Sequence, residues 1–545
     1  MSVIAQLPAL LPDWVRTMST TYLVLSAVVG LPALAILLNV ARQFLPQGKN
    51  APPLVFHIIP WFGSAADYGQ DPYAFLFRNR DKYGDLFEFV LLGRRVTVAL
   101  GPKGNNLSLG GKISQVSAEE AYTHLTTPVF GKGVVYDCPN EMLMQQKKFI
   151  KHGLTTEALQ SYAPLMSAET EHFFAHELDL SSGSSTSSKT VEVFHAMSEL
   201  IILTASRSLQ GKEVRNALDS KFAKLFWDLD AGFIPVNFMF TNLPLPVNVR
   251  RDKAHKQISE FYRNIIQKRR TGEKRADGQD EHDMITALTG CQYKTGVELT
   301  DSDIAHMMIA ILMAGQHTSS ATSSWTLLNL AHRPDVYEEL YNEHVKLFRN
   351  ADGSWREVTY EDTKTMPIMD ACIRETLRMH APIHSIYRKV LSAIPVPSSL
   401  SAPSETESYI IPANNFLMAA PGVSAMDPKI WDQPKNWNPH RWLDEKGVGA
   451  AALENYYGTS GEQVDYGFGQ VSKGTESPYQ PFGAGRHRCV GESYAYLQLS
   501  VILSYVVRNF TLKMENKEFP SPNYQTMIVI PLKGMVTFTK RQAEV

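Results

Sequence analysis

Cysteine is scarce in this chain, and its spacing excludes several classes of protein. The 545 residues contain four cysteines, Cys138, Cys291, Cys372 and Cys489, which lie far apart and form no CxxC pair. This spacing argues against a disulfide framework and against a structural zinc site. The chain also has no large excess of positive or negative residues. Its formal net charge is −2, so the composition gives no signal for binding nucleic acid. The sequence shows no internal repeat and no glycine-rich nucleotide-binding or flavin-binding fingerprint.

Helical periodicity, by contrast, runs through most of the chain. Apolar residues make up 44% of it, an ordinary globular balance. The spacing of these residues predicts helices at 141–152, 192–209, 249–270, 300–332, 335–349, 365–380 and 490–508. Short β-branched runs predict strands at 86–91, 95–100, 527–531 and 535–539. Three segments have the composition of surface insertions, at 181–189, 268–283 and 444–477. We expect one large, mainly α domain with small β-sheets.

The N-terminus is unusually apolar. No charged residue occurs from Thr17 to Ala41, and roughly 20 apolar residues suffice to cross a bilayer. We therefore expect an uncleaved transmembrane anchor at about 20–41, within an N-terminal region 1–45. The alternative is a buried core helix at the terminus. A proline-rich stretch predicts a stiff hinge at 46–70, ahead of the main domain at 71–545.

Near the C-terminus, glycines crowd around one cysteine in the stretch "PFGAGRHRCVGE", 481–492. Glycines allow a tight turn and close approach by a large flat ligand. A cysteine just before a helix is biased toward thiolate by the backbone N–H groups and the helix dipole. Such a thiolate suits an axial ligand of haem iron. The alternative is a structural cysteine in a glycine-rich turn, but the full string Phe482-x-x-Gly485-x-x-x-Cys489-x-Gly491 favours the haem ligand.

A second unusual stretch, "AILMAGQHTSSATSSW" at 310–325, interrupts an otherwise apolar helix. Gly315, Gln316, His317, Thr318 and Ser319 either bend helices or bond to their own backbone. Thr300 is placed to cap this helix, which we expect to end near His332, before Pro334. A lone buried histidine is usually a satisfied core residue, so His317 needs further evidence.

The cysteine string resembles the haem-binding loop of the cytochrome P-450 monooxygenases. That family also carries a Glu-x-x-Arg helix, matched by Glu375 and Arg378 in "DACIRETLRMHAPIHSIYRKV", and a second arginine, matched by Arg441 in "WNPHRW". The resemblance implies that these three residues are structural. It also implies the cytochrome P-450 fold, haem b bound through Cys489, and a glycine and threonine on a long helix over the haem.

Most members carry Asp or Glu before that threonine, whereas this chain has His317. The stretch Ala314–Ser319 is similar to one branch, the sterol 14α-demethylases. Further stretches resemble fungal members of this branch: "AYTHLTTPVFGKGVVYDCPN" (121–140), "TASRSLQGKEVR" (204–215), "DLDAGFIPVNF" (228–238) and "IHSIYRKV" (383–390).

By this resemblance we assign three groups of site residues. Thr318 and His317, with Asp230 as the acid that pairs with the histidine, are expected to be catalytic. The residues expected to hold the haem are Cys489, Tyr122, Tyr136, Lys147, Arg388, His487, Phe482, Gly483 and Gly485. The residues expected to line the sterol pocket are Phe130, Tyr136, Phe233, Gly315, His384, Ser385, Tyr387 and Met527. Aromatic residues are more often plain core, which is the alternative for this last group. Tyr387 stands where related fungal chains often have Phe or Met.

The resemblance implies removal of the 14α-methyl group of lanosterol or eburicol as formate, by three successive monooxygenations, in ergosterol biosynthesis. Each step would use O₂ and electrons from NADPH through a separate reductase, with cytochrome b5 as a further donor. Azole inhibitors would bind the same pocket. The expected location is the endoplasmic reticulum membrane, with the catalytic domain in the cytosol. The alternatives are a monooxygenase of another lipid or xenobiotic, and a sterol-binding paralogue without turnover. Whether His317 carries protons or only positions Asp230 stays open.

Overall fold

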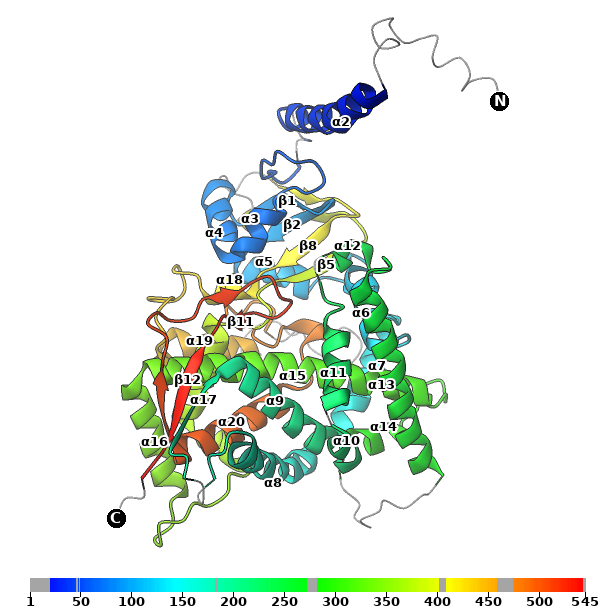
Figure 1. The fold of residues 1–545 in the computed structure, drawn as a ribbon. Helices are drawn as coiled ribbons and strands as arrows, with labels where there is room; N and C mark the ends of the chain where they lie inside the picture. The colour runs from blue at the N-terminus through cyan, green and yellow to red at the C-terminus, as the bar shows by residue number, and fades with distance from the viewer. Residues whose placement is uncertain are drawn as a thin grey trace, which may run out of the picture.

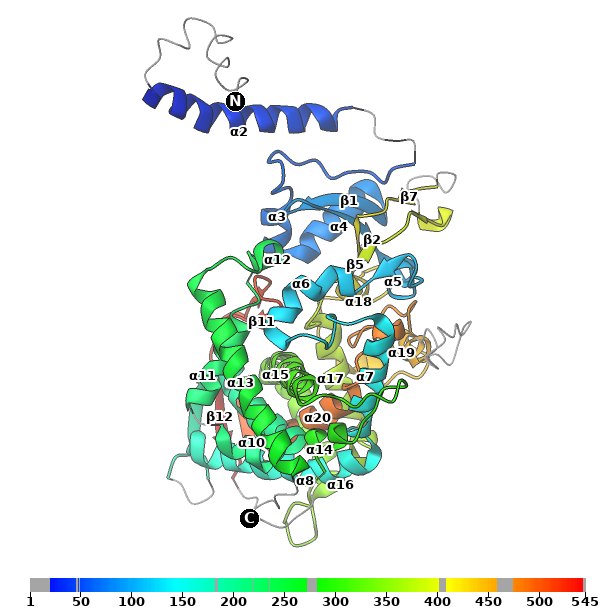
Figure 2. The same ribbon diagram turned by 90° about the vertical axis from the view of Figure 1, so that its right-hand side faces the viewer.

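The computed structural model describes residues 20–45, 48, 50–181, 185–218, 220–234, 236–271, 282–400, 408–457 and 474–542. One long helix, α15 (Asp301–His332), runs through the middle of the molecule (Figure 1), and Figure 2 views it almost end-on with other helices around it. Its 32 residues span about 48 Å at ~1.5 Å per residue. Thr300 caps its start: the Thr300 hydroxyl accepts a hydrogen bond from Asp303 N, and Asp303 accepts one from Thr300 N.

The remaining helices pack around α15 or cover the sheets, except α2, which projects from one end of the molecule. They are α2 (Thr20–Gln43), α3 (Ala65–Gln70), α4 (Pro72–Tyr83), α5 (Gly101–Leu109), α6 (Glu119–Phe130), α7 (Asn140–His152), α8 (Thr156–His172), α9 (Val193–Ala205), α10 (Lys212–Ala217), α11 (Ser220–Asp230), α12 (Asn237–Phe240), α13 (Pro246–Arg270), α14 (Met284–Thr289), α16 (Pro334–Phe348), α17 (Pro367–Met379), α18 (Pro421–Ala425), α19 (Val448–Tyr457) and α20 (Glu492–Asn509).

Four small sheets lie at the edges of this helical body. The largest has the order β1-β2-β8-β5-β3, from β1 (Leu86–Leu91), β2 (Arg94–Ala99), β8 (Phe416–Ala419), β5 (Ile386–Val390) and β3 (Val116–Ser117). In it β2 and β8 are parallel and the other pairs are antiparallel. A second sheet has the order β4-β12-β9, from β4 (Ser188–Glu192), β12 (Met535–Lys540) and β9 (Phe510–Met514). Two short pairs join β10 (Pro522–Asn523) to β11 (Ile530–Pro531), and β6 (Ile394–Pro395) to β7 (Ile410–Ile411).

The predicted fold class, mainly α with small sheets, is confirmed, and each helix predicted from periodicity is present within a few residues of its expected bounds. One local prediction was wrong: the run 527–531 forms a strand only at Ile530–Pro531. Two of the expected surface insertions contain regular structure, helix α19 within 444–477 and part of strand β4 within 181–189. In each case pairing or packing with distant segments decided the outcome, which local composition does not report. Residues 272–281 and 458–473, parts of two predicted insertions, lie outside the described residues.

The predicted hinge at 46–70 is attached to the large sheet over much of its length. Val55 N donates to Glu88 O at 2.7 Å, Glu88 N donates to Pro53 O at 2.7 Å, and Ser64 N donates to Val90 O at 2.8 Å. These backbone bonds extend the edge of β1, and α3 follows directly. The segment from about residue 53 onward therefore belongs to the main body.

The N-terminal helix α2 is present where an anchor was expected. Its described side chains include Val28, Val29, Leu37 and Leu38, each more than 60% exposed, and the helix projects from one end of the molecule (Figure 1). Across the described part of the chain, no helix meets the length and apolarity of a bilayer crossing.

Candidate active site

The hydroxyl-rich centre of α15 is an unbroken helix. Five of its hydroxyls each donate to the carbonyl four residues earlier: Thr318 to Ala314, Ser320 to Gln316, Thr322 to Thr318, Ser323 to Ser319, and Ser324 to Ser320, at 2.6–2.8 Å. This local bonding satisfies the hydroxyls without breaking the helix. The bend suggested by the sequence is therefore not needed to accommodate them.

One short part of α15 is accessible although the helix lies in the core. Ala314 is exposed and Gly315, His317 and Thr318 are half-buried, whereas the residues from Ser319 to Leu330 are buried. A Cβ added at Gly315 would meet no atom within 4 Å. The centre of α15 thus borders open space on one side.

The cysteine loop faces the same space. Cys489 N donates to Phe482 O at 2.9 Å, which closes the loop, and Gly491 N lies 3.4 Å from Cys489 Sγ. Gly485 has φ +65° and its Cβ would meet Leu109 O at 2.5 Å, so only glycine fits there. Gly483, at φ +69°, has nothing nearer than an Ile386 carbon at 3.9 Å, which leaves room for a flat ligand against the loop.

The protonation of Cys489 differs from the sequence-based prediction. Burial raises the pKa of the Cys489 thiol, outweighing the Gly491 N–H and the charge of Lys147, which both lower it. The Cys489 side chain lines the open space and is accessible from it. The helix-terminus effect alone therefore does not make this cysteine a thiolate, and a positive ligand such as a metal ion has to supply the rest.

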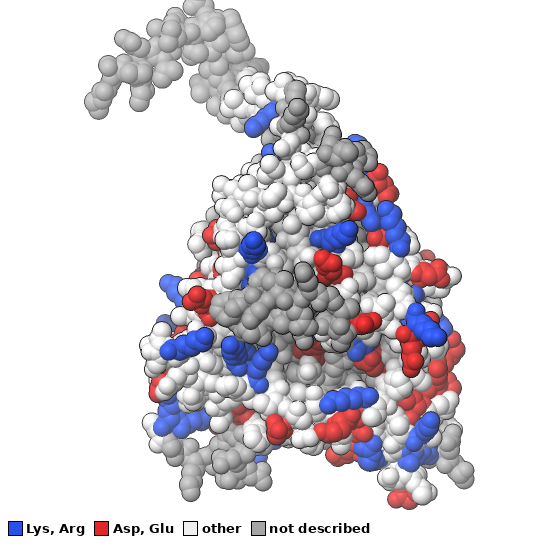
Figure 3. Space-filling model, turned by 180° about the vertical axis from the view of Figure 1, so that it is seen from behind, with Lys and Arg blue, Asp and Glu red and all other residues white. Residues whose placement is uncertain are grey.

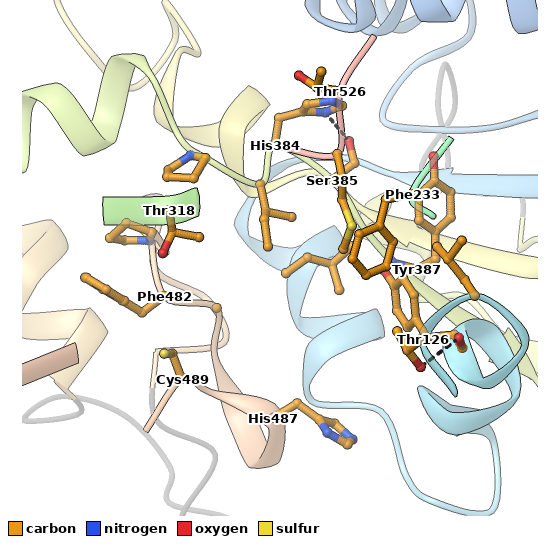
Figure 4. Close-up of a pocket in the computed structure, with 18 of the residues that line it drawn as sticks. Thr126, Phe233, Thr318, His384, Ser385, Tyr387, Phe482, His487, Cys489 and Thr526 are labelled. Carbon is orange, nitrogen blue, oxygen red and sulfur yellow. Dashed lines mark hydrogen bonds between the residues drawn. The ribbon is translucent and has the colours of Figure 1, made fainter. Parts of the chain in front are cut away.

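A cavity of about 510 Å³ joins the loop to α15 (Figure 4). Its wall includes Thr318 from α15 and Cys489 and Phe482 from the loop, which lie on one side of the view, while Phe233 and Tyr387 lie on the other. The predicted site residues that line it are Tyr122, Phe130, Tyr136, Phe233, Thr318, His384, Ser385, Tyr387, Arg388, Phe482, Gly483, His487, Cys489 and Met527. Lys147, Asp230, Gly315, His317 and Gly485 are not part of its wall.

A cluster of cations lies at the cavity: Arg388 is part of its wall, and Lys147 bonds to the cysteine loop that also lines it. Arg388 is buried and its Nε has no hydrogen-bond partner, and Lys147 donates to the carbonyls of Arg486 and Arg488 at 2.8 and 2.7 Å. Among the residues that the structure describes, neither of them forms an ion pair with a carboxylate. Burial lowers the pKa of Lys147 to about 8, and burial together with the charges of Arg388 and Lys147 lowers the pKa of His487 well below its ordinary value. Such a cluster suits a ligand that brings its own negative charges.

Two tyrosines stand beside this cluster. The rings of Tyr122 and Tyr136 stack at 5.2 Å between centroids, and Tyr136 lies 6.3 Å from the His487 ring. Burial raises the pKa of both phenols, that of Tyr122 to about 12, so both are neutral hydrogen-bond donors. The Tyr122 hydroxyl also accepts a bond from Tyr387 N at 2.8 Å, which ties α6 to β5.

At the far wall, the structure adds residues that the sequence reasoning missed. Tyr68 lines the cavity, and its hydroxyl lies 3.0 Å from that of Tyr387. Tyr524 and Thr526 also line it, next to Met527, and His384 Nδ1 bonds to Ser385 Oγ at 2.8 Å. Burial lowers the pKa of His384 to about 4, so this histidine is neutral. Tyr68 precedes the predicted main domain, and no motif in the sequence marked it.

Behind the loop, Glu375 is the centre of a fully buried network. Arg378 Nε and Nη2 bind its two carboxylate oxygens, each at 2.9 Å, and Arg441 Nε binds at 2.9 Å. Trp442 Nε1 and the backbone N of Asn438 complete the set at 3.0 Å each. All three residues predicted to be structural are therefore in contact. Trp442 lies in the same "WNPHRW" motif as Arg441, but the sequence did not show that its indole N–H donates to Glu375.

On the other side of α15, His317 meets the end of α11. His317 Nε2 lies 3.0 Å from Asp230 Oδ1, and the two side chains are 23% and 36% exposed. No other partner of either side chain is found among the described residues. The structure thus brings together two residues that are 87 positions apart, as the resemblance implied. One of them, His317, directly precedes Thr318.

Comparisons with known proteins identify the class to which this arrangement belongs. The cytochrome P450 family model matches residues 52–538. Among solved structures, a cyanobacterial CYP120A1 bound to retinoic acid shares the fold at a TM-score of 0.71 and 16% identity, covering 91% of this chain and 100% of that one. The cytochrome P450DA haem domain gives the same TM-score at 17% identity, covering 91% and 99%. The chain belongs to the cytochrome P450 family.

Close relatives narrow the class of protein further, to the fungal sterol 14α-demethylases within the cytochrome P450 family. A lanosterol 14-alpha demethylase of Mycosarcoma maydis is 52% identical over 98% of this chain and 95% of its own length. A sterol 14-alpha demethylase of Gibberella zeae is 47% identical over 88% of each chain, and one of Aspergillus fumigatus is 47% identical over 92% and 94%.

Family membership implies a haem with a cysteine thiolate on its iron, and the residues present fit such a group. Gly483 leaves the space that a flat macrocycle needs above the loop, and Cys489 faces that space. Arg388 and Lys147, which lack acidic partners among the described residues, and the neutral phenols of Tyr122 and Tyr136 match two carboxylates.

Proposed function

We propose that this protein is an oxidoreductase that removes the 14α-methyl group of lanosterol or eburicol as formate, in three successive O₂- and NADPH-dependent steps. The observation that carries the proposal is that Thr318 and Cys489 face one cavity whose remaining wall is mainly apolar. A sterol is rigid and apolar with one hydroxyl, so such a wall suits it. When bound, the haem supplies oxygen activation with electrons from outside the chain.

The haem-holding residues divide into three roles. Cys489 is the axial ligand, and Phe482, Gly483 and Gly485 shape the loop around it. Arg388, Lys147 and His487, with the phenols of Tyr122 and Tyr136, bind the propionates. Support comes from the buried Arg388 Nε, which has no hydrogen-bond partner among the residues that the structure describes.

The sterol-holding residues form the remainder of the wall. Phe130 and Phe233 pack with ring centroids 5.8 Å apart, from α6 and from the segment after α11. His384, Ser385, Tyr387 and Met527 close the cavity on the side of β5. Gly315 lies outside this wall, and the open space beside it on α15 would admit O₂. The Tyr68–Tyr387 hydroxyl pair makes this wall more polar than Phe or Met at position 387 would.

Thr318 and the His317–Asp230 pair supply protons in this proposal. The Thr318 hydroxyl lies in the cavity wall and bonds only to its own helix, so it can turn toward a ligand. His317 and Asp230 are partly exposed, and such a pair near the surface can open because water competes with it. Opening would connect solvent to Thr318.

The electron donor in this proposal is NADPH–cytochrome P-450 reductase, with cytochrome b5 as a further donor, and azoles are competing ligands. The site of action is the endoplasmic reticulum membrane. The exposed apolar side chains of α2 support attachment to a lipid surface.

The decisive experiment is a reconstituted assay. The full-length holoenzyme, reductase and NADPH are supplied with eburicol or lanosterol, and the sterol products and formate are measured. We expect 14-demethylated sterol, and no product from Cys489→Ala, which should also lose the carbon monoxide difference band of a thiolate-ligated haem. A holoenzyme with that band that converts neither sterol, while another lipid shifts its spin state, would contradict the proposed substrate. Sterol binding without turnover would instead point to a binding paralogue.

A further inference from the structure

A second hollow, of about 670 Å³, lies beside the cavity but has its own walls. It is formed by one face of α6, by Arg94 at the start of β2, and by α12 with the turn that follows it. None of its lining residues lines the first cavity. The proposed reaction gives it no role.

Arg94 brings a buried positive charge to this hollow. Its guanidinium lies over the rings of Phe238 and Phe416, 4.5 and 4.8 Å from their centroids, and its Nη2 donates to Phe238 O at 2.6 Å. His124 Nε2 is 2.9 Å from the same Nη2. The other terminal nitrogen, Nη1, is buried and has no hydrogen-bond partner. Within the described residues Arg94 has no carboxylate partner, so its charge is uncompensated.

Asp137 brings the opposite charge to the same hollow. Its Oδ1 accepts from the Thr127 hydroxyl and its Oδ2 from Gly133 N, each at 2.9 Å, and it meets no cation in the described part of the chain. His124, which contacts Arg94, and Thr127, which contacts Asp137, are three positions apart on α6. They therefore share one face of the helix, at a rise of about 4.5 Å. The hollow holds a cation and an anion side by side, without an ion pair between them.

The surroundings of the hollow are apolar. Phe240 and Leu243, both in its wall, are 48% and 39% exposed, and Phe240 stacks on Trp61, which is 48% exposed. In both ribbon views α12 lies at the end of the molecule from which α2 projects (Figures 1 and 2). The part of the rear face nearest α2 shows few charged side chains (Figure 3). Two uncompensated charges thus lie in a hollow at an apolar end of the molecule.

We propose that this hollow binds the zwitterionic headgroup of a phospholipid, with the phosphate at Arg94 and the ammonium group at Asp137. The two headgroup charges are joined by two carbons, and the α6 residues that contact Arg94 and Asp137 are about 4.5 Å apart along the helix, so one headgroup can meet both side chains. The acyl chains would leave across Phe240 and Leu243 toward the apolar end. A free anion would satisfy Arg94 but would face Asp137 with a like charge, so the charge pattern favours the zwitterion.

The test is calorimetric titration of the holoenzyme with dihexanoylphosphatidylcholine below its micellar concentration. We expect saturable binding that leaves the haem absorption unchanged. Arg94→Gln should weaken binding about tenfold, because it removes a charged hydrogen bond, and Arg94→Lys should restore part of the affinity. The matched control is Arg95→Gln, which removes the same charge from the neighbouring residue; Arg95 is outside the hollow and lies 3.2 Å from Glu88. The Arg95→Gln variant should bind the lipid with the same affinity as the unchanged protein.

A second arm tests the role of Asp137. The anionic dihexanoylphosphatidylglycerol should bind more weakly than the choline lipid, and Asp137→Asn should remove that preference. Four results would overturn the proposal: no saturable binding, equal affinity in Arg94→Gln, equal affinity for the two lipids, or displacement of the lipid by inorganic phosphate at matching concentration. A change in the haem spectrum on lipid binding would also overturn it, because the lipid would then occupy the other cavity.

Discussion

Two ion pairs stand on opposite sides of the haem site, and they differ in almost every physical respect. Glu375 is fully buried and accepts five hydrogen bonds, three from the guanidinium groups of Arg378 and Arg441. Asp230 is partly exposed and meets only the His317 ring. The buried pair is fixed because each partner left alone would be an uncompensated charge in the core. The exposed pair costs little to open, which suits a route that protons enter during turnover.

The largest expected effect is at the buried pair. Glu375→Gln leaves Arg378 and Arg441 without a carboxylate, at a cost of about 3–5 kcal/mol, a large share of the ~5–15 kcal/mol that a domain has in total. Urea unfolding followed by circular dichroism should show a much lower midpoint and little bound haem. The control is Glu339→Gln, which breaks the exposed His440–Glu339 pair and should change stability by less than about 1 kcal/mol. Equal losses in the two variants would contradict the contrast drawn between buried and exposed pairs.

The exposed pair should affect rate and leave stability unchanged. Asp230→Asn keeps the shape of the side chain but removes the charge that His317 meets, and we expect turnover to fall about 10- to 100-fold. Haem content and unfolding midpoint should not change. Asp228→Asn is the control, because Asp228 lies on the same helix but pairs with Arg250 at 3.4 Å. Unchanged turnover in Asp230→Asn would remove this pair from the proton route.

A histidine pair between α13 and α15 offers a third case, in which burial outweighs the nearby acids. The rings of His255 on α13 and His306 on α15 lie 5.1 Å apart, and His255 Nε2 is buried without a partner. Burial, and next the neighbouring His306, lower the pKa of His255 to about 4. Between pH 6.5 and 4 the folded protein therefore binds fewer protons than the unfolded chain, so stability falls as the pH falls.

His255→Gln should reduce that loss by about 3 kcal/mol across the same pH window. The measurement is the free energy of unfolding in urea at several pH values between 7 and 4, for both proteins. Parallel curves would show that His255 does not account for the acid sensitivity.

The sequence predicted the residues of the two ion pairs, which lie in recognisable motifs. It missed the contacts and the burial that depend on how distant segments pack together. The Glu-x-x-Arg and "WNPHRW" strings located both arginines of the buried network, and the pairing of His317 with Asp230 came from the family resemblance. Local pattern did not reveal that Trp442 reaches the same carboxylate, or that Tyr68 reaches the cavity wall, because both contacts join distant segments. It also did not reveal that burial raises the pKa of Cys489, because the helix terminus is visible in the sequence and the burial is not.

Substitutions of the α15 hydroxyls are expected to change stability least. They also allow a buried and a cavity-facing residue of the same helix to be compared directly. Ser323 and Thr318 each donate to the carbonyl four residues earlier, at the same 2.8 Å, but Ser323 is buried among packed helices and Thr318 faces the cavity. In each case alanine removes a bond to a carbonyl that already accepts a backbone N–H, and it improves helix propensity. We therefore expect both Ser323→Ala and Thr318→Ala to change stability by less than about 1 kcal/mol.

Turnover should separate the two variants. Thr318→Ala removes the only hydroxyl of this stretch that we place on the proton route, so NADPH consumption should continue while demethylated product falls. Ser323→Ala should keep the ratio of product to NADPH of the unchanged protein. If both ratios fell equally, the hydroxyls would act through the helix as a whole and the distinction between its cavity-facing and buried parts would fail. If neither fell, the proton would reach the site without Thr318.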